Sequence, residues 1–267
     1  MKDSNEIKAK ISMKIIGVIP ARYASTRLKG KVLADINGKP MIQHVWERAK
    51  ESKLLNDLII ASDSEVVIEK ARAFGAKAVL TAVHHPSGSD RVAEAVQSLN
   101  VDIVVNIQGD EPLIAPTVID DLVRTLRDDE HCVMATTIKR LSREEDLNDP
   151  SVVKVVVDQN QNALYFSRST IPYDRDRMGW KSVGYYRHLG IYAYRKDFLL
   201  NFIKLPKSHL EKIEQLEQLR VLEAGYKIKT VLTDMETIGV DTEEDLNRVR
   251  ELLKKTRHPE RSEGSPR

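Results

Sequence analysis

The sequence predicts an α/β protein built on a mostly parallel sheet with helices on both faces. Short apolar runs alternate with amphipathic helical patterns through the first half of the chain, and this order is typical of parallel strands joined by crossover helices. The length of 267 residues, with 41% hydrophobic and 31% charged residues, allows a buried core and excludes a mainly disordered chain. The length suits one large α/β domain or two small ones.

Four apolar runs in the first half predict buried strands. These runs span residues 14–20, 58–61, 78–80 and 101–107. Amphipathic patterns predict helices over residues 41–52, 65–74, 89–99 and 116–127. The ligand crevice of a parallel sheet lies at the carboxyl ends of its strands. We therefore expect ligand contacts just after Ile19 and just after Ile107.

The second half is less regular. Strands are predicted over residues 152–157, 163–166, 190–194 and 227–232, and helices over residues 208–224 and after residue 242. Gly225 stands in the usual position beyond the end of a helix, and Thr242 is a suitable N-cap. Leu246, Val249 and Leu253 should face inward from the last helix. The polar residues 173–182 predict a long loop that either passes over the sheet or forms an arm between subunits.

Both ends of the chain differ in composition from the predicted domain. Residues 1–12 are polar and rich in lysine, and residues 256–267 contain no apolar side chain outside proline and glycine. We predict a polar extension over residues 1–12, a single domain over residues 13–255 and a disordered tail. Met1 and Met13 are both candidate starts.

The charge balance excludes several classes of protein. Lys and Arg number 42 and Asp and Glu number 40, so the net charge is +2, without the basic excess of a dedicated nucleic-acid binder. No apolar run approaches the roughly 20 residues of a membrane span, and residues 1–12 lack the apolar core of a secretory signal. The single cysteine, Cys132, fits a reducing compartment and a buried position better than a nucleophile. We expect a cytoplasmic protein without nucleic-acid or membrane partners.

The segment PARYASTRLKGK, residues 20–31, is the strongest candidate for a phosphate site. Its basic residues are Arg22, Arg27, Lys29 and Lys31. They fall in one turn-rich loop at the edge of the sheet, and Gly30 allows close approach of the backbone to a polyphosphate. The segment is not a Walker A loop, because Val32 follows Lys31, and the chain has no GxGxxG motif. The alternative interpretation is a solvated basic loop.

Two acidic segments could supply metal ligands. Asp110 lies in NIQGDEP, where a predicted strand leaves the core, and Asp241 lies in IGVDTEED, just before the last helix. Mg²⁺ prefers one or two carboxylates together with phosphate oxygens and water. The alternatives are an ordinary turn around Asp110 and helix capping by Thr242 and Asp245, which leaves Asp241 available.

Further polar residues follow other predicted strands. In HPSGSDR, the small hydroxyl residues could contact a base or a phosphate, although Ser89 could equally cap the following helix. His84 and His85 are expected at the surface rather than on a metal. The second half holds a mixed polar set suited to a hydroxylated anion. Its members are Arg168, Arg187, His188, Glu217 and Gln218.

Seven segments together resemble the 3-deoxy-manno-octulosonate cytidylyltransferase family, also called CMP-KDO synthetase, where KDO is 3-deoxy-manno-octulosonate. The segments are PARYASTRLKGK, HPSGSDR, NIQGDEPLI, ALYFSRSTIPYDRDR, YRHLGIYAYR, LEQLRVLEAGYKI and GVDTEEDLNRVR. They occur in order from about residue 13 to about residue 254, and runs such as ALYFSR are not shared with other nucleotidyltransferases.

The resemblance implies a nucleotide-diphospho-sugar transferase fold, which is Rossmann-like, and an enzyme that converts CTP and KDO to CMP-KDO and pyrophosphate for lipopolysaccharide synthesis. It implies Mg²⁺ as cofactor and a homodimer formed through the second half, around residues 150–200. The reaction would be in-line attack of the anomeric hydroxyl on the α-phosphorus of CTP, assisted by the metal.

The resemblance also implies roles for individual residues. Lys31 and Arg22 would be catalytic and Asp110 and Asp241 would hold the metal. The implied nucleotide contacts are Pro20, Ala21, Arg22, Arg27, Lys31, Ser87 and Gln108. The implied sugar contacts are Arg168, His188, Tyr192, Glu217 and Gln218.

The sequence departs from the family in the basic loop, where Lys29 and Val32 replace two prolines of the usual RLPGKPL. This loss should make the free loop more flexible while leaving Lys31 in register. Two alternatives stay open: an enzyme for an 8-amino sugar acid or sialic acid, and a nucleotide-binding protein without turnover. The pair of Asp110 and Asp241 favours an enzyme over the second alternative.

Overall fold

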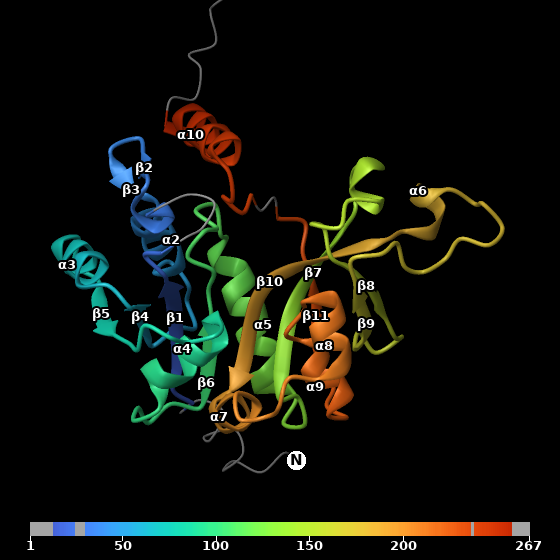
Figure 1. Ribbon diagram of the computed structural model, residues 1–267, viewed down its shortest axis with the longest axis horizontal. Coiled ribbons are helices and arrows are strands. Elements are labelled where there is room, and N and C mark those ends of the chain that lie inside the picture. The colour runs from blue at the N-terminus through green and yellow to red at the C-terminus, as the bar shows by residue number, and fades with distance from the viewer. Residues whose placement is uncertain (1–12, 25–29, 236–237, 258–267) are drawn as a thin grey trace, which may run out of the picture.

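A central mixed sheet forms the scaffold of the computed structural model, which describes residues 13–24, 30–235 and 238–257 (Figure 1). The main strands, in spatial order, are β11 (Lys229–Leu232), β7 (Met134–Arg140), β10 (Tyr186–Arg195), β6 (Ile103–Asn106), β1 (Ile15–Ala21), β4 (Asp57–Ser62) and β5 (Lys77–Leu80). Strand β10 is antiparallel to β6 and β7, while the other neighbours in this order are parallel. The prediction of a mostly parallel α/β sheet is confirmed.

The side chains of the strands point alternately to the two faces of the sheet, so each face carries its own core. From β1, Ile15 and Ile19 join one hydrophobic cluster, whereas Ile16 and Val18 join another. Helices α2 (Met41–Ala49), α3 (Glu65–Ala73) and α5 (Pro116–Asp128) cover the first face. Helices α4 (Gly88–Val96), α7 (Lys196–Phe202) and α9 (Leu219–Glu223) cover the second.

The elements predicted in the first half are present, with ends shifted by a few residues. Cys132 is buried, as expected, with 7% of its surface exposed. Strand β7 and helix α7 were not predicted. The β7 sequence MATTIKR contains few large apolar residues, and its burial in the middle of the sheet comes from its neighbours β10 and β11.

The helix predicted over residues 208–224 is wrong as a single element. It is divided into α8 (His209–Glu214) and α9, because Gln215 adopts a left-handed conformation with φ of 53°. The carbonyl of Glu214, at the end of α8, accepts a hydrogen bond from Arg168 at 2.7 Å. Periodicity alone cannot reveal this break, because buried Leu216 preserves the apolar pattern across it. Gly225, with φ of 83°, does follow the end of α9 as predicted.

Helix α10 (Glu243–Arg257) lies beyond the carboxyl edge of the sheet, near the hairpin of β2 (Asp35–Ile36) and β3 (Lys39–Pro40) (Figure 1). Ile36 packs there with Val240, Leu246 and Val249 in a separate small core. The predicted cap is confirmed, since the Thr242 hydroxyl accepts from the backbone of Asp245 and donates to its carboxylate.

A second antiparallel pair, β8 (Lys154–Val157) and β9 (Ala163–Ser167), joins the sheet through β10. The chain between β9 and β10 contains α6 (Trp180–Val183) and projects away from the sheet instead of passing over it (Figure 1). Tyr173 and Met178 on this projection are 88% and 62% exposed. The remaining short helices are η1 (Lys31–Leu33) and η2 (Glu145–Leu147).

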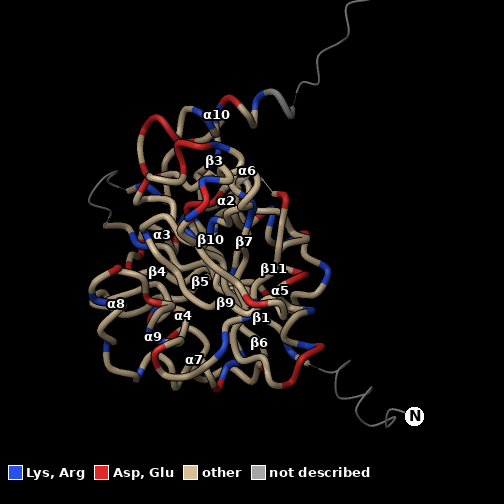
Figure 2. Tube along the Cα trace, turned by 90° about the vertical axis from the view of Figure 1, so that its right-hand side faces the viewer, with Lys and Arg blue, Asp and Glu red and all other residues tan. Residues whose placement is uncertain are grey.

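Basic and acidic residues are interspersed along the described trace (Figure 2). None of the helices in the described part of the chain combines the length and the hydrophobicity that a bilayer-spanning segment requires.

Candidate active site

Three segments meet at the end of β1. A Cβ added to Gly109 would lie 2.8 Å from the carbonyl oxygen of Pro20, and one added to Gly88 would lie 3.7 Å from the Pro20 ring. The segment after β6 therefore approaches β1 as closely as glycine permits, and the first turn of α4 lies in ordinary van der Waals contact with Pro20. This is the carboxyl edge at which the sequence predicts ligand contacts.

Lys31, Asp110 and Asp241 form an ion-paired cluster at this edge. The Lys31 Nζ atom lies 2.7 Å from Oδ2 of Asp110 and 3.0 Å from Oδ1 of Asp241, although 210 residues separate Lys31 from Asp241. The backbone N–H of Val240 donates to the carbonyl of Asp110 at 2.9 Å. That bond holds the segment before α10 against the segment after β6, so both carboxylates reach the same ammonium.

The cluster keeps Lys31 charged. Burial of the side chain, which is 13% exposed, disfavours the ammonium, but the two carboxylates more than offset this and raise the pKa of Lys31. A cation fixed at this point is suited to holding phosphate oxygens.

The same two carboxylates fit a divalent cation. Asp110 and Asp241 converge on one ammonium and retain 32% and 47% side-chain exposure, so their oxygens can reach an incoming ligand. No group of three or more His, Cys, Asp or Glu side chains in the described ranges is arranged to hold a metal. A Mg²⁺ ion here would complete its shell with phosphate and water oxygens, as is usual for this ion.

Arg22 extends from the end of β1 toward the loop before α4. Its Nη2 donates to the carbonyl of His85 at 2.7 Å. Glu94 of α4 holds this loop by accepting from the His85 ring and, at 2.9 Å, from the backbone of Ala82. Arg22 therefore lies against the loop before α4. Arg27 and Lys29 lie outside the described residues.

A buried arginine, to which the sequence analysis gave no role, supports the backbone at Tyr23, just after β1. Arg91 of α4 is fully buried, and its Nη2 lies 3.0 Å from the carboxylate of Asp63. Asp63 in turn accepts from the backbone N–H of Tyr23 at 3.2 Å. The sequence offered one sign of this role, because Arg91 falls on the apolar side of the helix predicted over residues 89–99.

Ser87 caps α4, which corrects the suggestion that Ser89 is the cap. The Ser87 hydroxyl accepts from the backbone of Asp90 and donates to its carboxylate at 2.5 Å. Gln108 also has a protein partner, since its Nε2 donates to the carbonyl of Gly190 at 2.6 Å. Both residues lie at the carboxyl edge, beside Pro20 and the buried Ala21.

His188 and Tyr192 lie on β10, on the second face of the sheet. Their ring centroids are 5.4 Å apart, and Phe166 contacts His188 edge-on at 5.0 Å. The Nε2 atom of His188 lies 2.9 Å from the Thr136 hydroxyl. Burial and the charge of Arg187 lower the pKa of His188 to about 3, so this imidazole is neutral near pH 7 and offers hydrogen bonds instead of charge.

Glu217 and Gln218 occupy the turn between α8 and α9. Glu217 accepts from the Ser89 hydroxyl at 2.6 Å. Gln218 is 4% exposed, and its Nε2 atom has no partner among the described residues. A buried donor without a partner is costly, and a bound ligand is one group that could satisfy it. Arg168 differs, because its guanidinium binds the carbonyls of Pro150 and Glu214.

The fold and this edge of ion-paired lysine and carboxylates fit an α/β nucleotidyltransferase, and the comparisons with known proteins establish that class. Residues 16–229 match a family described as Cytidylyltransferase. A solved structure of a CMP:2-keto-3-deoxy-manno-octonic acid synthetase complexed with CTP superposes with a TM-score of 0.86 and 46% identity, covering 91% of this chain and 99% of that one.

Curated relatives give the particular family. The 3-deoxy-manno-octulosonate cytidylyltransferase of Syntrophus aciditrophicus (strain SB) is 51% identical over 243 residues, which cover 90% of this chain and 97% of the relative. The enzyme of the same name from Solibacter usitatus (strain Ellin6076) is also 51% identical, over 241 residues that cover 90% and 95% of the two chains. The chain belongs to the 3-deoxy-manno-octulosonate cytidylyltransferase family, and the predicted family and fold are confirmed.

Proposed function

We propose that the chain transfers the cytidylyl group of CTP to KDO, releases pyrophosphate and thereby activates KDO for lipopolysaccharide synthesis. The observation that carries this proposal is the convergence of Lys31, Asp110 and Asp241 at the carboxyl edge of the sheet. The names of the curated relatives and the CTP complex of the similar solved structure support the choice of both substrates.

Lys31 and Arg22 hold the triphosphate in the proposed reaction, with Arg27 as a further contact from the same loop. The anomeric hydroxyl of KDO attacks the α-phosphorus in line, a new phosphorus–oxygen bond forms, and the bond to pyrophosphate breaks while the hydroxyl proton passes to solvent. Lys31 stabilises the negative charge that accumulates on the phosphates, because its ammonium is already fixed and partly desolvated. No side-chain general base is assigned.

Asp110 and Asp241 hold Mg²⁺ in this proposal. The bound ion would supply positive charge that neutralises the triphosphate. When the triphosphate binds, its oxygens would accept hydrogen bonds from the Lys31 ammonium in place of Asp110 and Asp241. The carboxylate oxygens freed in this way could then bind the cation.

Pro20, Ala21, Ser87 and Gln108 surround the nucleotide in the proposed complex, because they lie at the same edge as Lys31. The proposed sugar contacts form a second group. They are Arg168, His188, Tyr192, Glu217 and Gln218. Since His188 is neutral near pH 7, it would hydrogen-bond a hydroxyl, while the unpartnered Nε2 of Gln218 offers a further donor.

Pyrophosphate release by the purified protein tests the proposal. The expected result is Mg²⁺-dependent release with CTP and KDO together, and none when ATP, GTP or UTP replaces CTP. Release with an 8-amino sugar acid or sialic acid, and not with KDO, would change the substrate and preserve the mechanism. No release with any pair would contradict the proposed function.

We also propose a cytoplasmic homodimer with one catalytic domain over residues 13–255. The exposed Tyr173 and Met178 on the projecting segment between β9 and β10 support a contact between subunits there. Light scattering of the wild type and of a Tyr173→Ser/Met178→Ser variant tests this. A dimeric wild type and a monomeric variant are expected, and a monomeric wild type would contradict the proposal.

A further inference from the structure

A hydrogen bond between Ser89 and Glu217 joins the two halves of the chain. The Ser89 hydroxyl donates to Oε2 of Glu217 at 2.6 Å, across 128 residues of sequence. Ser89 is 3% exposed and lies in the first turn of α4, next to the cap Ser87 and to Gly88, which packs against Pro20. The bond therefore runs from the nucleotide edge to a predicted sugar contact.

The second carboxylate oxygen of Glu217, Oε1, faces the buried ion pair of Arg220 and Glu211. Arg220 donates from Nε and Nη2 to the two carboxylate oxygens of Glu211 at 2.8 and 2.6 Å, and both side chains are 8% exposed. The nearest oxygen of Glu217 lies 3.7 Å from Arg220 Nη2. Arg220 thus attracts Glu217, but its best donors are already bonded to Glu211.

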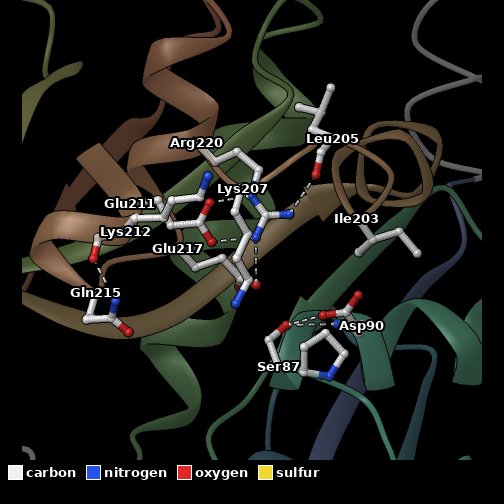
Figure 3. A pocket seen from close by; sticks show the side chains of 11 residues that line it. Ser87, Asp90, Ile203, Leu205, Lys207, Glu211, Lys212, Gln215, Glu217 and Arg220 are labelled. Atoms are coloured by element: carbon white, nitrogen blue, oxygen red, sulfur yellow. Dashed lines mark hydrogen bonds and ion pairs between the residues drawn. The ribbon is translucent and has the colours of Figure 1, made fainter. Parts of the chain in front are cut away.

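Glu217 remains accessible to a ligand. It lines a cavity of about 410 Å³ between the start of α4 and helix α8, and its side chain is 28% exposed. Figure 3 shows Glu217, Glu211 and Arg220 on one side of this cavity, with Ser87 and Asp90 on the other. Ser89 is the contact that draws the carboxylate of Glu217 toward the α4 side of the cavity.

We propose that Ser89 is a positioning residue that aims the carboxylate of Glu217 at the sugar acid. This inference rests on the proposed function. Without the hydroxyl, Glu217 loses its hydrogen bond on the α4 side while Arg220 stays 3.7 Å away, so the carboxylate turns toward Arg220 and presents less well to the sugar hydroxyls.

Steady-state kinetics with Ser89→Ala test the proposal. A hydrogen bond to a charged group of this kind predicts a KM for KDO that rises roughly tenfold to a hundredfold, with a KM for CTP within about twofold of the wild type. Ser89→Thr retains the hydroxyl and should restore the KM for KDO. Ser98→Ala, at an exposed serine just beyond α4, serves as the matched control and should behave as the wild type.

A double variant distinguishes loss of the positioning of Glu217 from general damage to helix α4 by Ser89→Ala. In a Glu217→Ala background, the additional Ser89→Ala change should have little effect on the KM for KDO, because the group it positions is gone. A full additional loss, an unchanged KM for KDO in Ser89→Ala, or an equal rise in both KM values would overturn the proposal. Absence of turnover by the wild type would instead contradict the proposed function, and this inference with it.

Discussion

The neutral imidazole of His188 should make the stability of the protein fall steeply in mild acid. Burial and the charge of Arg187 lower the pKa of His188 to about 3, compared with 6.5 in its ordinary state. The unfolded chain therefore takes up a proton as the pH falls below about 6.5, whereas the folded chain does not until about pH 3. The contribution of this residue to stability is complete above pH 6.5 and is lost as the pH falls between these values.

The size of the effect follows from these two pKa values. The difference in proton binding removes about 2 kcal/mol of unfolding free energy by pH 5 and about 3 kcal/mol by pH 4. A His188→Gln variant keeps an amide that can reach the Thr136 hydroxyl, now 2.9 Å from Nε2, and lacks the titrating group. Between pH 8 and pH 5 or 4, the unfolding free energy of His188→Gln should therefore fall less than that of the wild type, by these amounts. This difference does not depend on how stable the variant is at pH 8.

Urea unfolding of the wild type and of His188→Gln at pH 8, 6 and 5, followed by circular dichroism, measures this difference. His131→Gln, at an exposed histidine in the turn before β7, controls for the loss of one histidine and should keep the dependence of the wild type. Equal pH dependence in the wild type and His188→Gln would refute the reasoning, because the folded imidazole would then titrate as the unfolded one does.

Three further predictions concern the site and its supports. Lys31→Ala should lower kcat by about 10² to 10³, since it removes a fixed charge donor, and a kcat near that of the wild type in the pyrophosphate assay would exclude the assigned role. Gly109→Ala should destabilise the protein by about 1–3 kcal/mol and lower the affinity for CTP, because the new Cβ would lie 2.8 Å from the carbonyl oxygen of Pro20. Calorimetry of unfolding measures the loss of stability, and CTP titration measures the loss of affinity. If neither quantity changed, the close approach of Gly109 to Pro20 would be contradicted. Glu211→Gln should cost about 1.5–3 kcal/mol in urea unfolding, since a neutral amide replaces the carboxylate bonded to the buried Arg220 while Glu217 stays 3.7 Å away; a loss below about 0.5 kcal/mol would contradict a strong contribution from this ion pair.

Much of the scaffold was predictable because local pattern and tertiary structure agree. The apolar runs that form β1, β4 and β6 are buried on both faces, so their composition alone identifies them. The same pattern located Lys31 and Asp110, since both follow strands whose ends must meet at one edge of the sheet. Family motifs added the proposed sugar contacts, whose spacing along the chain does not bring them together.

The elements that the sequence analysis predicted wrongly or did not predict have a common cause. Strand β7 owes its burial to neighbouring strands instead of its own composition, and the break at Gln215 interrupts an apolar pattern that continues through Leu216. In each case, contacts between distant segments decided the local structure.

The sequence by itself determined the α/β class, the family and the charged residues of the proposed phosphate site, because strand composition and ordered motifs are local properties of the chain. Only the tertiary structure decided which of those groups meet. The bond from Val240 to Asp110 brings the carboxylate of Asp241 to Lys31, and the division between α8 and α9 accompanies the contact of Glu217 with Ser89. These contacts span more than a hundred residues, and they form because packing of the whole sheet supplies the free energy that orders both partners.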